Sequence, residues 1–201
     1  MKKGLIALIV VVVLVLMVGG TLMGKYNSFV GLQEGVDGQW GNVENVYQRR
    51  ADLIPNLVET VKGYASHEQE TLTAVIEARA KATQIQAQLT PETLNDPQLM
   101  QKFQAAQGEL SSALARLMVV VERYPDLKAN QNFLDLQAQL EGTENRIAVE
   151  RRRFNDMARD YNTAIRRFPG SIVAGITGFD KKTYFEADEG AATAPKVDFG
   201  N

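Results

Sequence analysis

Cysteine is absent from this chain of 201 residues, histidine occurs once, and proline occurs only six times. The lack of cysteine excludes disulfides, thiolate metal sites and a lipid-modified cysteine anchor. Outside one apolar run, the Val–Thr–Ile alternation typical of strands is missing, and no second run reaches membrane length. The sequence also has no phosphate-cradling glycine loop, nucleophile elbow or metalloprotease helix motif, so it predicts a protein that is not an enzyme.

An excess of positive charge is missing as well. The formal net charge is −2 at pH 7, which argues against a body that binds nucleic acid. The arginines between residues 146 and 167 alternate with acidic residues, as expected for a solvent-exposed helix with salt bridges. His67 has no converging set of metal ligands, so we interpret it as an exposed helix residue. We therefore expect no cofactor and no nucleic-acid partner.

The chain does contain one long apolar run, over residues 5–23. As a helix this run is about 28 Å long, close to the hydrocarbon thickness of a bilayer. The alternative is a cleaved signal peptide, but the run is longer than a signal core and no clear A-x-A-like cleavage site follows it. We therefore expect residues 1–24 to be a retained membrane anchor. Lys2 and Lys3 precede the run and only Lys25 follows it closely, so the positive-inside rule places the N-terminus in the cytoplasm and the body outside.

The rest of the chain has the apolar periodicity of helices. Aromatic or aliphatic residues recur every seven positions from Tyr26 to Ile54, except for Gln33, and from Phe133 to Phe168 without exception. A loop rich in proline and threonine separates two of the helical patterns at residues 89–97. The sequence predicts long helices over residues 25–50, 55–86, 97–123 and 130–168.

Two local signals predict interruptions of the first helical pattern. Pro55 lacks a backbone donor and disfavours helical geometry in the residue before it, so we expect a kink or break between Arg50 and Pro55. Residues 66–69 have the spacing of a capping box, which makes residues 63–66 a second weak point. A row of glycines in the same pattern is expected to allow a neighbouring helix to approach closely; these are Gly31, Gly35, Gly38 and Gly41.

These patterns predict an all-α protein, with an N-terminal transmembrane helix followed by an elongated antiparallel four-helix bundle. We divide the chain into the anchor at residues 1–24, the bundle at 25–169 and a C-terminal part at 170–201. In the last part we expect a short helix at 171–176, and we expect Phe179, Tyr184 and Phe185 to fold back on the bundle. Residues 191–201 are small and polar, and we expect them to be disordered.

Charged residues lie on or beside the apolar seams, where an unpaired charge is costly. Glu144 lies seven residues before Arg151 and so shares its helix face. Either Arg50 or Arg79 is expected to reach Glu144 from a neighbouring helix. We interpret the set as interhelical ion pairs that fix helix register, with a ligand site or coupled carboxylates as the alternative. This predicted structural polar network comprises Arg50, Asp52, Glu77, Arg79, Glu144 and Arg151.

Several motifs in a fixed order resemble the LemA family of bacterial membrane proteins. The motifs are Tyr-Asn at 26–27 and 161–162, RRADLIPNL at 49–57, EARA at 77–80, YPDLKAN at 124–130, LEGTENRI at 140–147, Phe-Asn at 154–155 and Phe-Pro at 168–169. The resemblance covers nearly the whole chain after the anchor. It implies an N-terminal anchor followed by an antiparallel bundle of four main helices, and it implies no particular reaction.

The sequence therefore favours a membrane-anchored scaffold or adaptor without catalytic activity. We expect it to contact the lipid bilayer and to organise or regulate other membrane proteins, with self-assembly into a homo-oligomer as one route. The alternative, from a different class, is a ligand-binding sensor or hydrolase that uses the inter-helix carboxylates. A pore component fits less well, because there is one span and the charged residues lie outside it.

Overall fold

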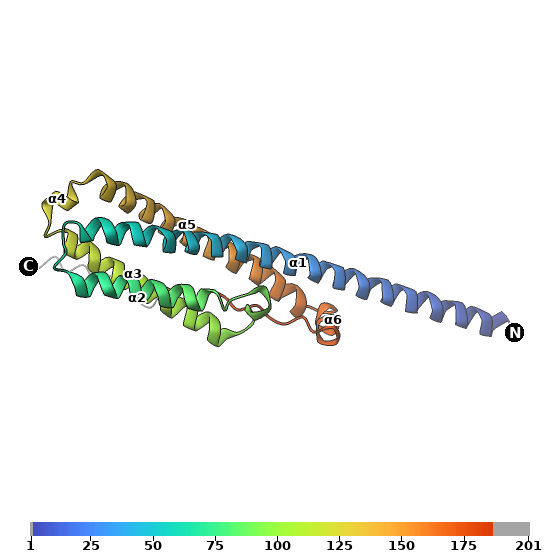
Figure 1. The fold of residues 1–201 in the computed structure, drawn as a ribbon. Helices are drawn as coiled ribbons and strands as arrows, with labels where there is room; N and C mark the ends of the chain where they lie inside the picture. Colours follow the sequence, from blue (N-terminus) through green and yellow to red (C-terminus); the bar gives the residue numbers. More distant parts are fainter. Residues whose placement is uncertain (1, 187–201) are drawn as a thin grey trace, which may run out of the picture.

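The computed structural model describes residues 2–186, and over this range every regular element is helical. This confirms the predicted all-α class with a long apolar N-terminal helix (Figure 1). The elements are α1 (Lys2–Lys62), α2 (Gln69–Gln86), the 3₁₀ turn η1 (Pro91–Thr93), α3 (Pro97–Val121), α4 (Pro125–Lys128), α5 (Gln131–Arg166) and α6 (Gly170–Thr177). The predicted disordered residues 191–201 lie outside the described range.

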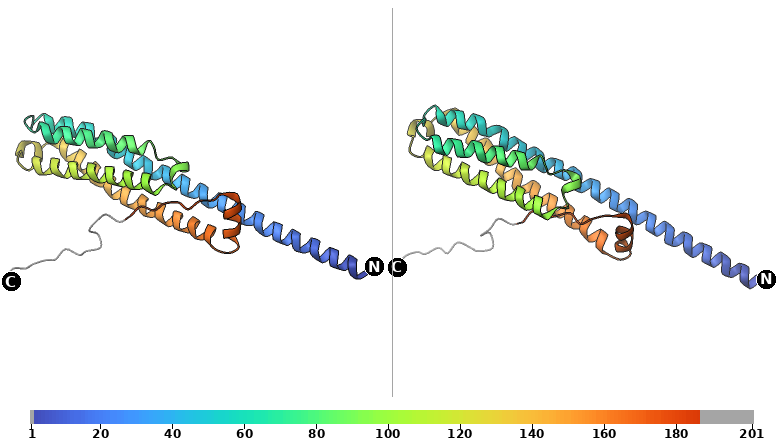
Figure 2. Two further views of the ribbon diagram at one scale, coloured as in Figure 1. Left: turned by 90° about the horizontal axis from the view of Figure 1, so that it is seen from below. Right: turned by 60° about the horizontal axis from the view of Figure 1, so that its bottom comes forward.

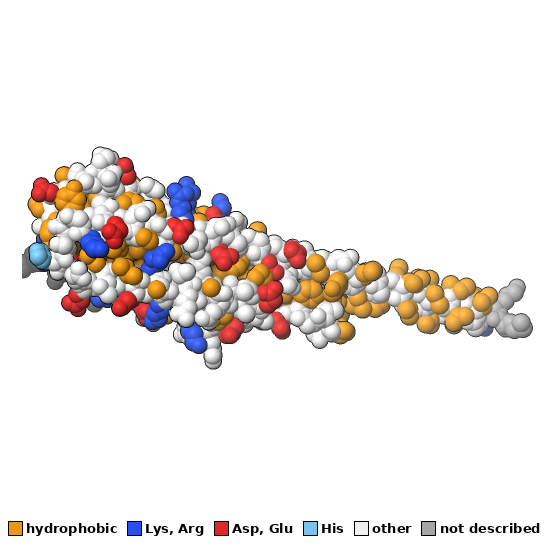
Figure 3. All heavy atoms as spheres, viewed as in Figure 1, with side chains coloured by type: hydrophobic (Ala, Val, Ile, Leu, Met, Phe, Trp, Pro, Cys, Tyr) orange, Lys and Arg blue, Asp and Glu red, His pale blue; other side chains and the backbone are white. Residues whose placement is uncertain are grey.

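Helix α1 has two parts with different surroundings. Its N-terminal part projects from the rest of the molecule and is covered by apolar side chains (Figure 3). Among the described residues, α1 is the one helix long and apolar enough to cross a membrane, and none of its most apolar window is buried. The second part of α1 is a wall of the helical body (Figure 1). The candidate membrane segment therefore continues into the body without a linker.

The predicted break at Pro55 does not occur, because α1 is helical through Pro55 to Lys62. Proline at this position cannot donate to the carbonyl of Ala51, four residues earlier. In the structure, Arg79 of α2 supplies the missing donor, and its Nε lies 2.6 Å from the Ala51 carbonyl oxygen. A donor from another helix thus satisfies the acceptor that proline leaves open, and the helix continues.

The actual interruption lies at the second weak point. Residues 63–68 form turns between α1 and α2, and Glu68 is the N-cap residue of α2 without a side-chain capping hydrogen bond. The predicted capping box at residues 66–69 is therefore wrong, although the location of the turn is right. The glycine row was also expected to meet a neighbouring helix, but no atom of another helix lies within 4 Å of a Cβ built at Gly31, Gly35, Gly38 or Gly41.

The long helices run alternately away from and toward the α1 projection (Figures 1 and 2). The most extensive pairings are α1 with α5 and α2 with α3, and α2 also packs on α1. The heptad seam of α5 is buried from Phe133 to Tyr161. Phe168, its expected sixth member, is 83% exposed, because α5 ends at Arg166 and the following residue is extended.

Two apolar clusters stabilise the body. The cluster nearer the projecting helix is aromatic, with Trp40 in contact with the rings of Phe103, Phe154 and Phe185. The distal cluster is mainly aliphatic, and α1, α2, α3 and α5 all contribute to it. Phe185 is buried, which confirms that the chain after α6 folds back onto the body. Phe179 and Tyr184 pack against the same aromatic cluster.

Candidate functional site

Arg50 joins three helices through one guanidinium group. The residue belongs to α1 and is 2% exposed. Its Nη1 donates to the Glu144 carboxylate of α5 at 2.8 Å and to the Ser111 hydroxyl of α3 at 3.1 Å, and its Nη2 donates to the side-chain oxygen of Gln107. Its Cζ also lies 5.3 Å from the ring centre of Tyr47. The planar, multiple-donor geometry of arginine suits this arrangement, and a lysine ammonium would not reproduce it.

The other members of the predicted network lie elsewhere. Arg79 supports the Ala51 carbonyl, as described above. Asp52 is exposed and accepts a 2.8 Å hydrogen bond from Gln48 on its own helix, and Glu77 is exposed. Arg151 lies beside the C-terminal segment, where it donates to the Glu186 carbonyl at 2.8 Å and lies 5.1 Å from the ring centre of Phe185. The structure thus brings Arg50 and Glu144 together and places Arg151 at a separate contact.

An open groove lies next to the Arg50–Glu144 pair, between α3 and α5. It has a volume of about 550 Å³. Side chains three or four residues apart on each helix line it, which is the spacing of one helix face. The lining residues are Ser111, Leu114, Ala115, Met118, Gln137, Leu140, Glu141, Glu144 and Asn145. Leu114 and Leu140 are buried and, with Ala115 and Met118, give the groove an apolar part, while Glu141 and Glu144 are among its polar lining residues. This combination is suited to a peptide segment with apolar side chains.

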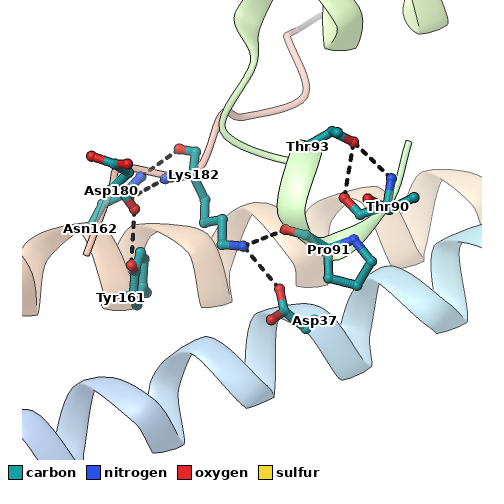
Figure 4. A network of polar contacts seen from close by, with 8 residues as sticks. All are labelled: Asp37, Thr90, Pro91, Thr93, Tyr161, Asn162, Asp180 and Lys182. Atoms are coloured by element: carbon teal, nitrogen blue, oxygen red, sulfur yellow. Dashed lines mark hydrogen bonds and ion pairs between the residues drawn. The ribbon is translucent and has the colours of Figure 1, made fainter. Parts of the chain in front are cut away.

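The sequence did not reveal a second polar junction, around Lys182 (Figure 4). Lys182 is 6% exposed, and its Nζ donates to Asp37 of α1 at 3.1 Å and to the Pro91 carbonyl at 2.8 Å. Its backbone exchanges two hydrogen bonds with the Asn162 side chain, at 2.9 and 2.8 Å. The junction therefore ties the chain after α6 to α1, to the loop before α3 and to α5.

Only a weak signal in the sequence points to this junction. The Tyr-Asn pair at 161–162 is one of the LemA-like motifs, and Asn162 supplies both side-chain hydrogen bonds to Lys182. Lys181 and Lys182 are adjacent in the sequence, but Lys181 is exposed and Lys182 is buried. Apolar periodicity predicts which residues are buried only in helices and strands, and this segment is irregular. The sequence therefore does not show which of the two lysines is buried.

A small polar cleft of about 150 Å³ opens beside the junction, with Asp37, Glu92, Tyr161 and Asp180 among its lining residues. Burial, together with the nearby carboxylates of Asp180 and Asp37, raises the pKa of Tyr161 to about 12. The Tyr161 hydroxyl donates to the Asp180 carbonyl at 2.9 Å. A hydrogen bond from the Thr90 side chain lowers the pKa of Glu92. Across residues 2–186, no cluster of three or more histidine, aspartate and glutamate side chains is arranged to hold a metal ion.

Comparison with known proteins identifies a family and several relatives of this chain. The model of the LemA family matches residues 39–199. The magnetosome protein MamQ of Magnetospirillum gryphiswaldense is 31% identical over 179 residues, which cover 82% of this chain and 66% of that protein. MamQ 2 of Paramagnetospirillum magneticum is 33% identical over 181 residues, with 83% and 66% covered. Protein LemA of Metamycoplasma hominis is 23% identical over 167 residues, with 83% and 71% covered.

The fold therefore defines an all-helical protein with an N-terminal candidate transmembrane helix. The chain belongs to the LemA family, because the family model matches most of its length. It spans 66% of the length of the MamQ relatives that it matches.

Proposed function

We propose that this protein is a membrane-anchored scaffold or adaptor that organises other membrane proteins. The observation that carries the proposal is the continuity of α1, which is one helix from the candidate membrane segment to the far end of the body. A helix of 61 residues is about 90 Å long. The same helix packs along α5 and α2. A force that a bound partner exerts on the body is therefore transmitted directly to the membrane segment.

The orientation that we propose follows from the lysines around the apolar segment. Lys2 and Lys3 precede this segment, and Lys25 is the first basic residue after it. The positive-inside rule then puts the N-terminus in the cytoplasm and the body outside it. A body on that side contacts the extramembrane parts of neighbouring membrane proteins or further copies of itself.

The surface that we assign to a protein partner is the groove between α3 and α5. It lies on the half of the body that includes Leu114, Met118 and Leu140, away from the projecting part of α1. Its apolar part and open form suit a segment of another polypeptide. The alternative, a ligand sensor or hydrolase, relies on Glu144, which lines the groove but already forms an ion pair with Arg50 at 2.8 Å.

A pair of single-cysteine variants tests the assignment, since the chain has no cysteine of its own. Met118→Cys places a thiol in the groove, and Val119→Cys places one on the neighbouring residue, which is 69% exposed. In intact cell membranes, thiol cross-linking followed by mass spectrometry is expected to give a defined adduct from position 118 that is absent from position 119. Identical adducts from both positions, or no adduct together with a monomer in native mass spectrometry, would contradict the scaffold proposal.

A further inference from the structure

The short helix α6 lies beside the point where α1 leaves the body (Figures 1 and 2). A Cβ built at Gly170, its first residue, would lie only 2.7 Å from Cζ of Phe29 on α1. Just after α6, the ring of Phe179 lies 5.6 Å from that of Tyr26 and 5.5 Å from that of Phe29. Phe29 follows the last residue of the apolar run by six positions, about 9 Å along the helix axis. The α6 region therefore lies within reach of the headgroup layer of any bilayer that α1 spans.

The side of α6 that faces away from the body exposes two isoleucines, together with the small residues Ser171, Gly175 and Thr177. Val173 and Ala174 are buried against the body. In contrast, Phe168, Ile172 and Ile176 are 83%, 48% and 77% exposed. Each of these lies four positions after the one before it, so on α6 Ile172 and Ile176 lie on one side of the helix. We call Phe168, Ile172 and Ile176 the α6 stripe.

The α6 stripe lies in an uncharged segment that has basic residues on both sides. No residue from 168 to 179 is charged. Arg166 and Arg167 immediately precede the stripe, and Lys181 follows it, next to Asp180. All three basic residues are exposed, as is Lys25 on α1. An uncharged segment flanked by basic residues, with Tyr26 close by, is the pattern of a helix that lies in a lipid interface.

We propose that α6 is a second membrane contact of this chain, with the α6 stripe inserted among the lipid headgroups and the upper part of the acyl chains. This proposal depends on α1 spanning the bilayer. The α6 contact then adds a second attachment point at the end of the body from which α1 projects. One helix alone allows the body to tilt and rotate about its axis. Two contacts on the bilayer surface fix the direction in which the groove between α3 and α5 faces.

The stripe favours lipid over a protein partner because of where it lies. Helix α6 lies at the end of the body that adjoins the projecting helix (Figure 1), and hydrophobic side chains are exposed on both the projecting helix and that end of the body (Figure 3). A protein partner would have to occupy the layer that phospholipid headgroups already fill. Exposed isoleucine and phenylalanine at this level are instead covered by the bilayer itself.

Spin labels at single cysteines test this contact in the full chain. The protein is reconstituted into vesicles of phosphatidylcholine and phosphatidylglycerol, with a nitroxide on Ile176→Cys or, as the matched control, on Val119→Cys. Both parent residues are exposed aliphatic side chains, at 77% and 69%, and Val119 lies on α3 in the body. Collision rates are measured with oxygen, which concentrates in lipid, and with a water-soluble nickel chelate. We expect oxygen to dominate at position 176 and the nickel chelate to dominate at position 119.

Three results separate the possible failures. If position 176 is as accessible to the nickel chelate as position 119, the lipid contact is wrong. If position 176 is shielded from both reagents, the stripe is covered by protein, and the proposal is also wrong. A label on Val13→Cys, in the candidate span, reports separately whether α1 is in lipid. Ile172→Cys replaces Ile176→Cys if circular dichroism shows that the latter does not fold.

Discussion

At the scale of single residues, the side chains with most influence on the body are those that link helices from inside it. Arg50 is almost fully buried, whereas its partner Glu144 is 43% exposed. The pair Lys81–Glu109 also joins two helices, at 2.6 Å, but both partners are about half exposed. Exposed pairs contribute about 0–1 kcal/mol, whereas loss of one partner leaves a buried charge uncompensated. The two pairs have similar distances between their charges, and they differ in the burial of the basic side chain.

We expect Glu144→Ala to lower the free energy of unfolding by about 1–3 kcal/mol, because the Arg50 guanidinium then loses its charged partner while remaining buried. Glu109→Ala is the matched control, with an expected loss of about 0–1 kcal/mol. Urea unfolding of the full chain in detergent measures both values. Equal losses in the two variants would mean that Arg50 does not depend on Glu144.

The Tyr161 hydroxyl makes stability depend on alkaline pH. A tyrosine in the unfolded chain ionises near pH 10, whereas in the folded protein the pKa of Tyr161 is about 12. The stabilisation is therefore complete below pH 10 and is lost as the pH rises from 10 to 12, by up to about 3 kcal/mol. We expect the melting temperature of the native chain to fall more between pH 9 and pH 11 than that of Tyr161→Phe.

A control for this pH dependence is Tyr64→Phe, which removes a hydroxyl from a tyrosine that is 45% exposed. Its melting temperature is expected to follow that of the native chain over the same pH range. If Tyr161→Phe also follows the native curve, ionisation of Tyr161 does not contribute to the alkaline loss of stability.

At the scale of elements, α1 shows how a neighbouring helix corrects a local defect. Pro55 leaves the Ala51 carbonyl without its helical donor, and Arg79 of α2 supplies one at 2.6 Å. The hydrogen bond also ties α2 to α1. The motifs that contain these residues, RRADLIPNL and EARA, thus meet in space although they are separated in the sequence.

We expect a double-mutant cycle to show this dependence. Arg79→Ala leaves the carbonyl of Ala51, a residue that is 5% exposed, without a donor and costs about 1–3 kcal/mol. In a Pro55→Ala background the backbone N–H of residue 55 is restored, so the same Arg79→Ala change costs about 1 kcal/mol less. Thermal unfolding of the four proteins gives the coupling. Equal costs in both backgrounds would show that Arg79 does not replace the missing donor.

At the scale of the whole molecule, α1 joins the candidate membrane segment and the body in one continuous helix. Gly24 lies at the end of the apolar run, and no atom of another element lies within 4 Å of a Cβ built there. The helix is therefore free of tertiary contact at that residue. The scaffold role that we propose depends on this continuity, whereas folding of the body depends on contacts farther along the chain, such as those of Trp40 and Arg50.

We expect a flexible Gly-Ser insertion between Gly24 and Lys25 to separate these two properties. The melting temperature of the body should change little, because the two core clusters lie almost entirely beyond the insertion. Function in the cell should fall, and an insertion of the same length in the loop at Asn95, on the surface of the body, serves as the control. Unchanged function with the Gly-Ser insertion would contradict mechanical coupling through α1.

The amino-acid sequence by itself determined which segments are helical and where the membrane candidate lies, because these properties depend on composition and spacing within one segment. The predicted C-terminal ends of α2 and α3 agree with the structure to within two residues, and the returning Phe179 and Phe185 were expected as well. Only the tertiary structure decided that Pro55 is accommodated, that Arg50 and not Arg79 reaches Glu144, and that Lys182 is buried. Each of these outcomes depends on the register and depth of a second helix or segment, and periodicity along a single segment contains no information about either.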